Sequence, residues 1–239
     1  MNKYLDKIIN ADCLDILKHL PDNCVDLVIT DPPYLIKNTT AGSNSDFAKS
    51  FQKMNNELKN SGLSSGVTLD FCKEIIRLQK KINAYIWCSK SQIIDYLDFF
   101  VKKHKCNFDI LCWQKLNAAP TFNNKYLTDK EYCLYFRKNG YCNPANYEDA
   151  RTIFSSFINI KDKKLFKHPT IKPLDIISTL VKNSSRAGDV ILDCFSGSGT
   201  TAVACHNLNR HFICIEKDPD YWAASVKRLE EAKQQFNLF

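Results

Sequence analysis

The chain has 239 residues, 44% of them hydrophobic, which is enough to bury a large core without disulfides or metal ions. Its formal net charge of +7 is compatible with a polyanionic partner but is not diagnostic of one. The first ten residues lack the apolar core of a signal peptide, and no run approaches 18 apolar residues, so we expect a cytoplasmic protein without a membrane partner.

The chain contains 11 cysteines, an odd number with no C-x-x-C pair, and many of them fall within apolar runs. This usage is typical of buried, reduced thiols that pack as small hydrophobic side chains. The five histidines show no metal-ligand spacing, so no metal site is expected.

Strand-like and helix-like stretches alternate along the chain, which predicts an α/β fold with a mainly parallel sheet covered on both faces. In chain order we predict strand 7–10, helix 14–20, strand 25–30, helix 69–80, strand 84–88, helix 92–103, strands 108–114 and 131–136, helix 174–183, strand 190–193, helix 200–207, strand 212–216 and helix 219–236. Since no helix separates 108–114 from 131–136, these two strands are expected to pair antiparallel at one edge.

The segment Asp31-Pro32-Pro33-Tyr34 follows the predicted strand 25–30. Two prolines stiffen the loop and remove two N–H donors, which leaves the Pro32 carbonyl available as an acceptor. Asp31 adds a carboxylate acceptor and Tyr34 a flat aromatic face. Together these groups suit the exocyclic amino group of a planar base, although an ordinary strand-end turn would also explain the pattern.

Polar segments follow this motif. Residues 37–66 are rich in Asn, Ser and Lys, and we expect a flexible lid that orders around a ligand, the alternative being an insertion without a role. Residues 117–130 form a second polar loop, which is either a nucleic-acid contact or a plain hairpin connection. Lysines gather at 102–105 and again at 161–167, where they lie on a solvated face or contact phosphates.

A glycine-rich turn follows the predicted strand 190–193 and precedes a helix. Gly197 and Gly199 allow backbone angles and close ligand approach that a Cβ would block. Glu216 ends the next strand, about 20 residues further on, where an acidic side chain can accept hydrogen bonds from both ribose hydroxyls of a nucleoside cofactor. Asp31, Asp193 and Glu216 all stand at the carboxyl ends of predicted strands, where such sheets bind ligands.

Three motifs in one order resemble those of the amino-group DNA methyltransferases. Asp193 to Thr200 resembles their D-P-F-x-G-S-G-T motif, Asp31 to Tyr34 their catalytic D/N/S-P-P-Y/F motif, and His168 to Pro173 their H-P-T-x-K-P motif. The order, catalytic motif first, resembles the β group, which has a circularly permuted arrangement. Cys194 replaces the usual proline of the first motif and Ile171 the frequent glutamine of the third, and neither position supplies the chemistry.

The resemblance implies a Rossmann-like methyltransferase fold, with a mainly parallel seven-stranded sheet and an antiparallel edge hairpin. It implies one domain over residues 1–239 with a short target-recognition region. The cofactor would be S-adenosylmethionine and the partner DNA, with a homodimer and a cognate restriction endonuclease as further expected partners.

The resemblance also implies roles for individual residues. The catalytic set would be Asp31, Pro32, Pro33 and Tyr34. The cofactor-binding set would be Asp12, Cys13, Asp31, His168, Thr170, Lys172, Asp193, Phe195, Ser196, Gly197, Ser198, Gly199, Thr200, Thr201, Glu216 and Lys217. For Lys172, a surface lysine before a helix-starting proline is an equal alternative.

The expected reaction is methylation of the N6 amino group of a flipped-out adenine, because aspartate in the first motif position resembles adenine enzymes. Cytosine N4 and an RNA or protein amino group are alternatives within the same chemistry. A nicotinamide-dependent oxidoreductase would use the glycine turn but not the segment 31–34. A non-catalytic nucleic-acid-binding module would need no cofactor turn at all.

Overall fold

The computed structural model describes residues 1–34, 69–120, 126–158 and 171–236. The predicted lid at 37–66 and the predicted site residues His168 and Thr170 therefore lie outside the described residues, as does the lysine group at 161–167.

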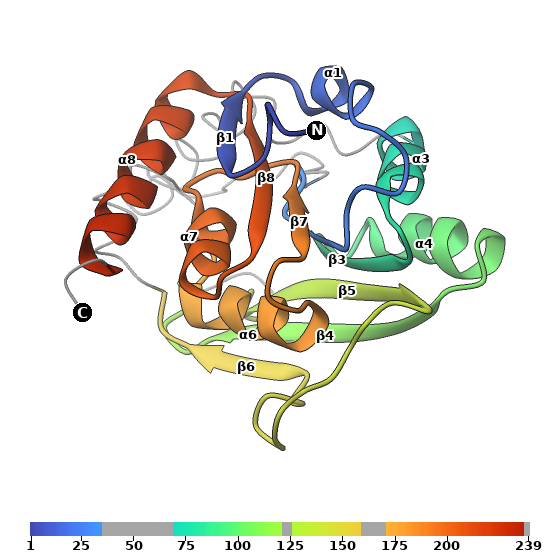
Figure 1. Cartoon of the computed structure of the whole chain (residues 1–239). Coiled ribbons are helices and arrows are strands. Elements are labelled where there is room, and N and C mark those ends of the chain that lie inside the picture. Colours follow the sequence, from blue (N-terminus) through green and yellow to red (C-terminus); the bar gives the residue numbers. More distant parts are fainter. Residues whose placement is uncertain (35–68, 121–125, 159–170, 237–239) are drawn as a thin grey trace, which may run out of the picture.

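An eight-stranded sheet in the order β1-β8-β7-β2-β3-β5-β4-β6 forms the centre of the molecule (Figure 1). The strands are β1 (Lys7–Asn10), β2 (Leu27–Thr30), β3 (Ile82–Cys88), β4 (Asn107–Lys115), β5 (Lys130–Lys138), β6 (Ile153–Ser156), β7 (Val190–Asp193) and β8 (His211–Glu216). Strand β5 runs antiparallel to β3 and β4, and the other neighbouring pairs are parallel. The predicted mainly parallel α/β sheet is confirmed, as is the antiparallel pairing of the strands predicted at 108–114 and 131–136.

The predicted number of seven strands and the edge position of the hairpin are wrong. Strand β6 adds an eighth strand outside β4, with Ile153 opposite Cys112 and Ser156 opposite Lys115. Its four residues have two exposed and two partly buried side chains. Four residues without a fully buried side chain are too few to show the hydrophobic periodicity that would predict a strand.

The helices are α1 (Cys13–Leu17), α3 (Leu69–Leu78), α4 (Ile93–Tyr96), α6 (Leu174–Ser184), α7 (Thr200–Asn207) and α8 (Pro219–Phe236). The helix predicted over 92–103 is partly wrong, because α4 continues as the π-helix η1 (Leu97–Lys103). There the His104 amide donates to the Phe99 carbonyl, five residues back, at 3.3 Å. Among the described residues, no helix is long and apolar enough to cross a membrane.

Helices cover both faces of the sheet (Figure 1). On one face, side chains of α1, α3, α4 and η1 pack on the strands, with Leu17, Ile75 and Phe100 completely buried. On the other face, α6, α7 and α8 contribute Leu180, Val203 and other apolar side chains. Because the central strand β2 is buried on both faces, it reads as the continuous apolar run that is typical of parallel strands.

The turn between β7 and α7 passes close to α8. Gly199 has φ of +76°, which L side chains rarely adopt. A Cβ built on Gly199 would lie 2.9 Å from the Cβ of Ser225 in α8. The absence of a side chain at Gly199 therefore serves both the backbone angle and the packing of α8 against the turn.

We predict that Gly199→Ala lowers the free energy of unfolding by more than the ~1–2 kcal/mol that the left-handed backbone alone costs a residue with a Cβ. Gly188→Ala is the matched control, because Gly188 has φ of +82° but nothing within 4 Å of its Cβ position. Urea unfolding of the two variants separates strain from steric overlap. Equal destabilisation by the two substitutions would contradict the tight packing of Ser225 on the turn.

Candidate active site

Four acidic side chains gather at one edge of the sheet. Strands β1, β8, β7 and β2 are consecutive parallel neighbours, so their carboxyl ends lie at the same edge. Asp193 and Glu216 end β7 and β8, while Asp31 and Asp12 follow β2 and β1 within two residues. The prediction that Asp31, Asp193 and Glu216 stand at the carboxyl ends of parallel strands is confirmed.

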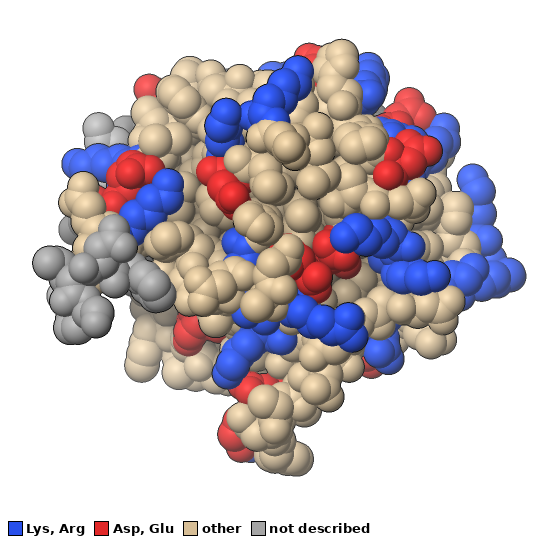
Figure 2. All heavy atoms as spheres, in the orientation of Figure 1, with Lys and Arg blue, Asp and Glu red and all other residues tan. Residues whose placement is uncertain are grey.

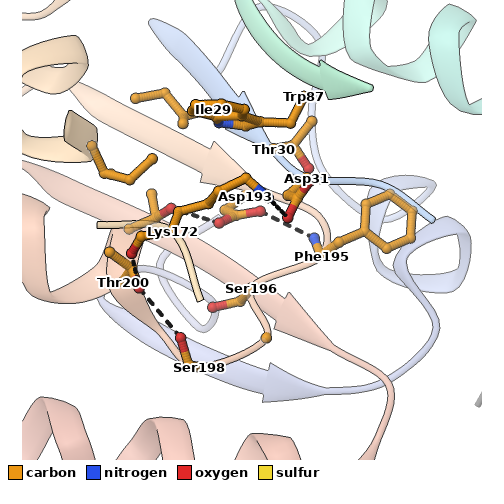
Figure 3. Close-up of a pocket in the computed structure, with 13 residues that line it drawn as sticks. Ile29, Thr30, Asp31, Trp87, Lys172, Asp193, Phe195, Ser196, Ser198 and Thr200 are labelled. Atoms are coloured by element: carbon orange, nitrogen blue, oxygen red, sulfur yellow. Dashed lines mark hydrogen bonds and ion pairs between the residues drawn. The ribbon is translucent and has the colours of Figure 1, made fainter. Parts of the chain in front are cut away.

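A pocket opens at this edge (Figure 3), with about 370 Å³ of space when the solvent at its mouth is included. It is lined by Ile29, Thr30, Asp31, Trp87, Lys172, Ile177, Asp193, Phe195, Ser196, Gly197, Ser198, Thr200 and Thr201. The pocket brings the predicted catalytic carboxylate, the lysine of the third motif and most of the glycine turn onto one surface.

The glycine turn is held from behind by an arginine. Arg228 of α8 is 7% exposed and donates to the Ser198 carbonyl at 3.2 Å and to Thr200 Oγ1 at 2.9 Å. On the pocket side, the hydroxyl of Ser196 is buried and has no hydrogen-bond partner among the described residues. The turn is thus fixed on its outer side and offers a polar atom to a ligand on its inner side. Sequence reasoning missed Arg228, because no motif marks it within α8.

Asp193 and Glu216 shape the turn through backbone amides. Asp193 accepts from the Phe195 amide at 3.1 Å and from the Thr201 hydroxyl at 2.6 Å. Glu216 accepts from the Gly197 amide at 2.7 Å. Burial raises the pKa of Asp193 to about 7, with the two donors opposing the shift, and burial likewise raises the pKa of Glu216. Both carboxylates hold the turn in place before any ligand arrives.

Lys172 connects the catalytic motif to the rest of the site. Its ammonium group donates to Asp31 Oδ2 and lies 3.0 Å from Oε2 of Glu131 in β5. In Figure 3 its side chain points toward Asp31. Because Lys172 is only 6% exposed, the alternative that it is a surface lysine is wrong. Its own backbone carbonyl accepts from Thr200 Oγ1 at 3.4 Å, which ties Lys172 to the glycine turn as well.

The surroundings of Asp31 have opposing effects on the pKa of its carboxyl group. Burial raises the pKa of the Asp31 carboxyl, the Lys172 ammonium opposes this shift, and the Glu131 carboxylate adds to it. Although burial disfavours the charged ammonium, the two carboxylates raise the pKa of Lys172 above its usual value. Asp31 Oδ1, the oxygen that does not bond Lys172, is buried and has no hydrogen-bond partner among the described residues. Asp31 lines the pocket, so this oxygen is a candidate acceptor for a ligand there.

Tyr34 lies beside this ion pair. Its hydroxyl donates to Glu131 Oε2 at 3.5 Å and accepts from Lys172 at 3.4 Å. The Pro33 carbonyl accepts from the side-chain amide of Gln92 at 3.1 Å, and Pro32 is buried, so the segment is anchored on both sides of the prolines. The ring of Trp87 lies 5.0 Å from the Lys172 ammonium and completes the apolar wall.

Glu131 and its partner Lys115 are site residues that sequence reasoning missed. Lys115 in β4 lies 2.5 Å from Glu131 Oε1, and both side chains are largely buried. The strand periodicity contains a signal for them. Glu131 is in phase with the buried Cys133 and Tyr135, and Lys115 is in phase with Leu111 and Trp113. A charged residue on the buried face of a strand predicts a charge partner inside the protein.

Asp12, Cys13 and Lys217 do not line the pocket. Asp12 caps α1 by accepting from the Leu14 amide at 3.0 Å, and its other oxygen bonds Lys217 at 3.0 Å. Cys13 packs in the core, where burial raises the pKa of its thiol to about 12. The Asp12–Lys217 pair nevertheless stands beside Glu216, because β1 and β8 are neighbours.

The first lysine group, residues 102–105, lies at the opposite edge of the sheet. These lysines come just before the first residue of β4, which pairs with Arg137 near the end of β5. The next residue, Lys138, pairs with the first residue of β3, so the lysines lie near the amino end of β3, away from the carboxyl ends that form the pocket. On the face drawn in Figure 2, basic side chains are interspersed with acidic ones. The expected phosphate contact by these lysines is therefore remote from the pocket.

Comparison with known proteins identifies relatives that match most of the chain. The model of the N6/N4 DNA methylase family matches residues 25–227. The type II methyltransferase M2.MboI of Moraxella bovis is 30% identical over 94% of this chain and 87% of its own length. M2.DpnII of Streptococcus pneumoniae is 29% identical over 96% of this chain and 91% of its own length.

Solved structures show the same fold. The crystal structure of the M1.HpyAVI–SAM complex has a TM-score of 0.66 and 26% identity, and it covers 93% of this chain and 99% of its own. The cytosine-N4-specific PvuII DNA methyltransferase has a TM-score of 0.70 at 16% identity, covering 97% of this chain and 91% of its own. With a family model spanning most of the chain and relatives aligned over nearly its full length, the chain belongs to the N6/N4 DNA methylase family.

Proposed function

We propose that this DNA methyltransferase uses S-adenosylmethionine to methylate the exocyclic N6 amino group of adenine in DNA. The observation that carries the proposal is the buried, unpartnered Oδ1 of Asp31, because Asp31 lines the same pocket as the glycine turn. An acceptor in that position suits an amino group that is presented beside a bound methyl donor.

The pocket residues fit S-adenosylmethionine. The unpartnered Ser196 hydroxyl and the Phe195 side chain line one wall, and the first amides of α7 favour the methionine carboxylate. By the resemblance, Glu216 at the end of β8 would accept from the ribose hydroxyls and Asp12, which follows β1, from the adenine. The structure of the relative M1.HpyAVI, which is a SAM complex, supports the same cofactor. When bound, S-adenosylmethionine supplies an electrophilic methyl group on sulfur.

The residues of this chain then act by positioning. A base within a duplex must be flipped out of the stack to reach the pocket. Tyr34 would stack on the flipped base, while Asp31 Oδ1 and the Pro32 carbonyl accept hydrogen bonds from its amino group. Such bonds turn the nitrogen lone pair out of the ring system and toward the pocket. Lys172 keeps Asp31 ionised, so that the carboxylate remains an acceptor.

Adenine is proposed over cytosine because aspartate occupies the first motif position. The likeness to the cytosine-N4-specific PvuII enzyme, at 16% identity, concerns the fold alone. The β-group assignment is supported by the order of the motifs, since Asp31 precedes the glycine turn in the sequence. A single methyltransferase domain with a short target-recognition region, a homodimer and a cognate endonuclease remain predictions from the resemblance.

Incubating the protein with labelled S-adenosylmethionine and unmethylated duplex DNA, followed by digestion to nucleosides, tests the proposed product. We expect the label in N6-methyladenine. Label in N4-methylcytosine would overturn the choice of base and leave the mechanism standing. Label only in RNA or protein substrates, with cofactor binding intact, would overturn the proposed substrate.

We also predict that Asp31→Ala reduces methyl transfer far more than tenfold and leaves S-adenosylmethionine affinity within about threefold of wild type, because Asp31 contacts the amino group. Single-turnover rates and calorimetric binding measure the two effects. Asp98→Ala is the control, since Asp98 forms an exposed ion pair with Lys102 away from the pocket. A variant that keeps more than about a tenth of the rate, ~1.4 kcal/mol of barrier, would refute the assigned role of Asp31.

A further inference from the structure

Four buried or partly buried charges alternate in sign across the site. Lys115 Nζ lies 2.5 Å from Glu131 Oε1, Glu131 Oε2 lies 3.0 Å from Lys172 Nζ, and Lys172 bonds Asp31. The four come from β4, β5, the segment before α6 and the end of β2. A chain of ion pairs thus runs from the hairpin strands to the catalytic carboxylate.

The positive charge of Lys172 does not require Glu131 as a partner. Lys172 and Asp31 alone form a neutral pair, and adding Glu131 introduces a charge that requires Lys115 as a second partner. The Glu131 and Lys115 side chains are 12% and 18% exposed, so both lose much of their hydration. Desolvating two additional charges is unfavourable by several kcal/mol per ion before their attraction is counted. The additional pair therefore points to a function at the site.

Glu131 contacts Lys172 and Tyr34, the two side chains next to Asp31. It shares the Lys172 ammonium with Asp31, and it accepts from the Tyr34 hydroxyl at 3.5 Å. Glu131 does not line the pocket. Its carboxylate acts on the site through two contacts. One is Lys172, which also bonds Asp31, and the other is Tyr34, whose ring would stack on the base.

We propose that Glu131, held by Lys115, is a positioning residue that competes with Asp31 for Lys172 and so keeps the catalytic carboxylate a strong hydrogen-bond acceptor. If Lys172 bonded Asp31 alone, its ammonium would withdraw more charge from the Asp31 carboxylate. Asp31 would then be a weaker acceptor for the amino group of the base. The same contact orients the Tyr34 ring. This inference rests on the proposed methyl transfer.

The sign of the pH dependence follows from the charges around Asp31. The titratable groups that act on Asp31 or respond to it are Lys172, Glu131, Tyr34, Cys88, Tyr96, Cys133 and Asp193. Although burial opposes ionisation, Lys172 and Lys115 lower the pKa of Glu131 to about 2, so Glu131 is charged throughout the working range. Its negative charge adds to the rise in the pKa of Asp31 that burial causes. Removing it lowers the pKa of Asp31.

The test is the pH profile of kcat and of kcat/KM for wild type, Glu131→Gln and Lys115→Met, with S-adenosylmethionine and duplex DNA. For Glu131→Gln we expect the acidic limb to move to lower pH by about one unit, and the plateau kcat to fall about tenfold. Lys115→Met should move the limb to higher pH, because Glu131 then draws Lys172 away from Asp31. KM for S-adenosylmethionine should stay within about threefold in both variants.

Asp26→Asn is the matched control, since Asp26 is a partly buried carboxylate that pairs with Lys80 just before β2, at the other edge of the sheet. It should leave the limb unmoved. If Glu131→Gln does not fold, as judged by loss of S-adenosylmethionine binding, the Lys115→Met shift carries the test. If both variants are active, and their acidic limbs and kcat are the same as in wild type, the proposed role of Glu131 is wrong. A wild-type protein that binds the cofactor but methylates no DNA would instead refute the proposed function.

Discussion

The ion pair between Lys172 and Asp31 is the interaction on which the rest of the site depends. Lys172 is 6% exposed, and a buried ammonium is stable only with anionic partners. Through its side chain it fixes the carboxylate at the end of β2, and through its carbonyl it accepts from Thr200 at the start of α7. One residue therefore connects the segment 31–34 to the glycine turn.

The acidic side chains at the edge of the sheet divide into two kinds. Asp193 and Glu216 already accept hydrogen bonds from the turn, and they hold its backbone in the angles that the glycines allow. Asp31 instead keeps one buried oxygen without a partner among the described residues. Carboxylates that look alike in the sequence thus differ in their bonding, because of these three only Asp31 has an oxygen without a hydrogen-bond partner among the described residues.

Much of this arrangement could be predicted from the sequence. Central strands such as β2 and β7 are continuous apolar runs, and the acids that follow them must meet at one edge of a parallel sheet. Strand β6 could not be predicted, because its four residues are too few for a periodic pattern and none of their side chains is fully buried. The same limit applies to η1, since nothing in the helical periodicity of 92–103 distinguishes a π-helix from an α-helix.

The charges behind the site escaped prediction for a different reason. Short motifs record residues that touch a ligand, whereas Glu131 and Lys115 touch only other residues. Their phase with Cys133 and Trp113 is visible in the sequence, but which buried charges meet depends on how β4, β5 and the segment before α6 pack. Partnership across the sheet is a property of the tertiary fold.

The most direct test of this account is the ionisation of Asp31 itself. Carboxyl-¹³C-labelled aspartate, with the Asp31 signal assigned by its loss in Asp31→Asn, reports the titration of this group by NMR. If Lys172 holds Asp31 ionised, the Asp31 signal titrates at higher pH in Lys172→Met than in wild type. An Asp31 titration that is the same in both proteins would contradict the account.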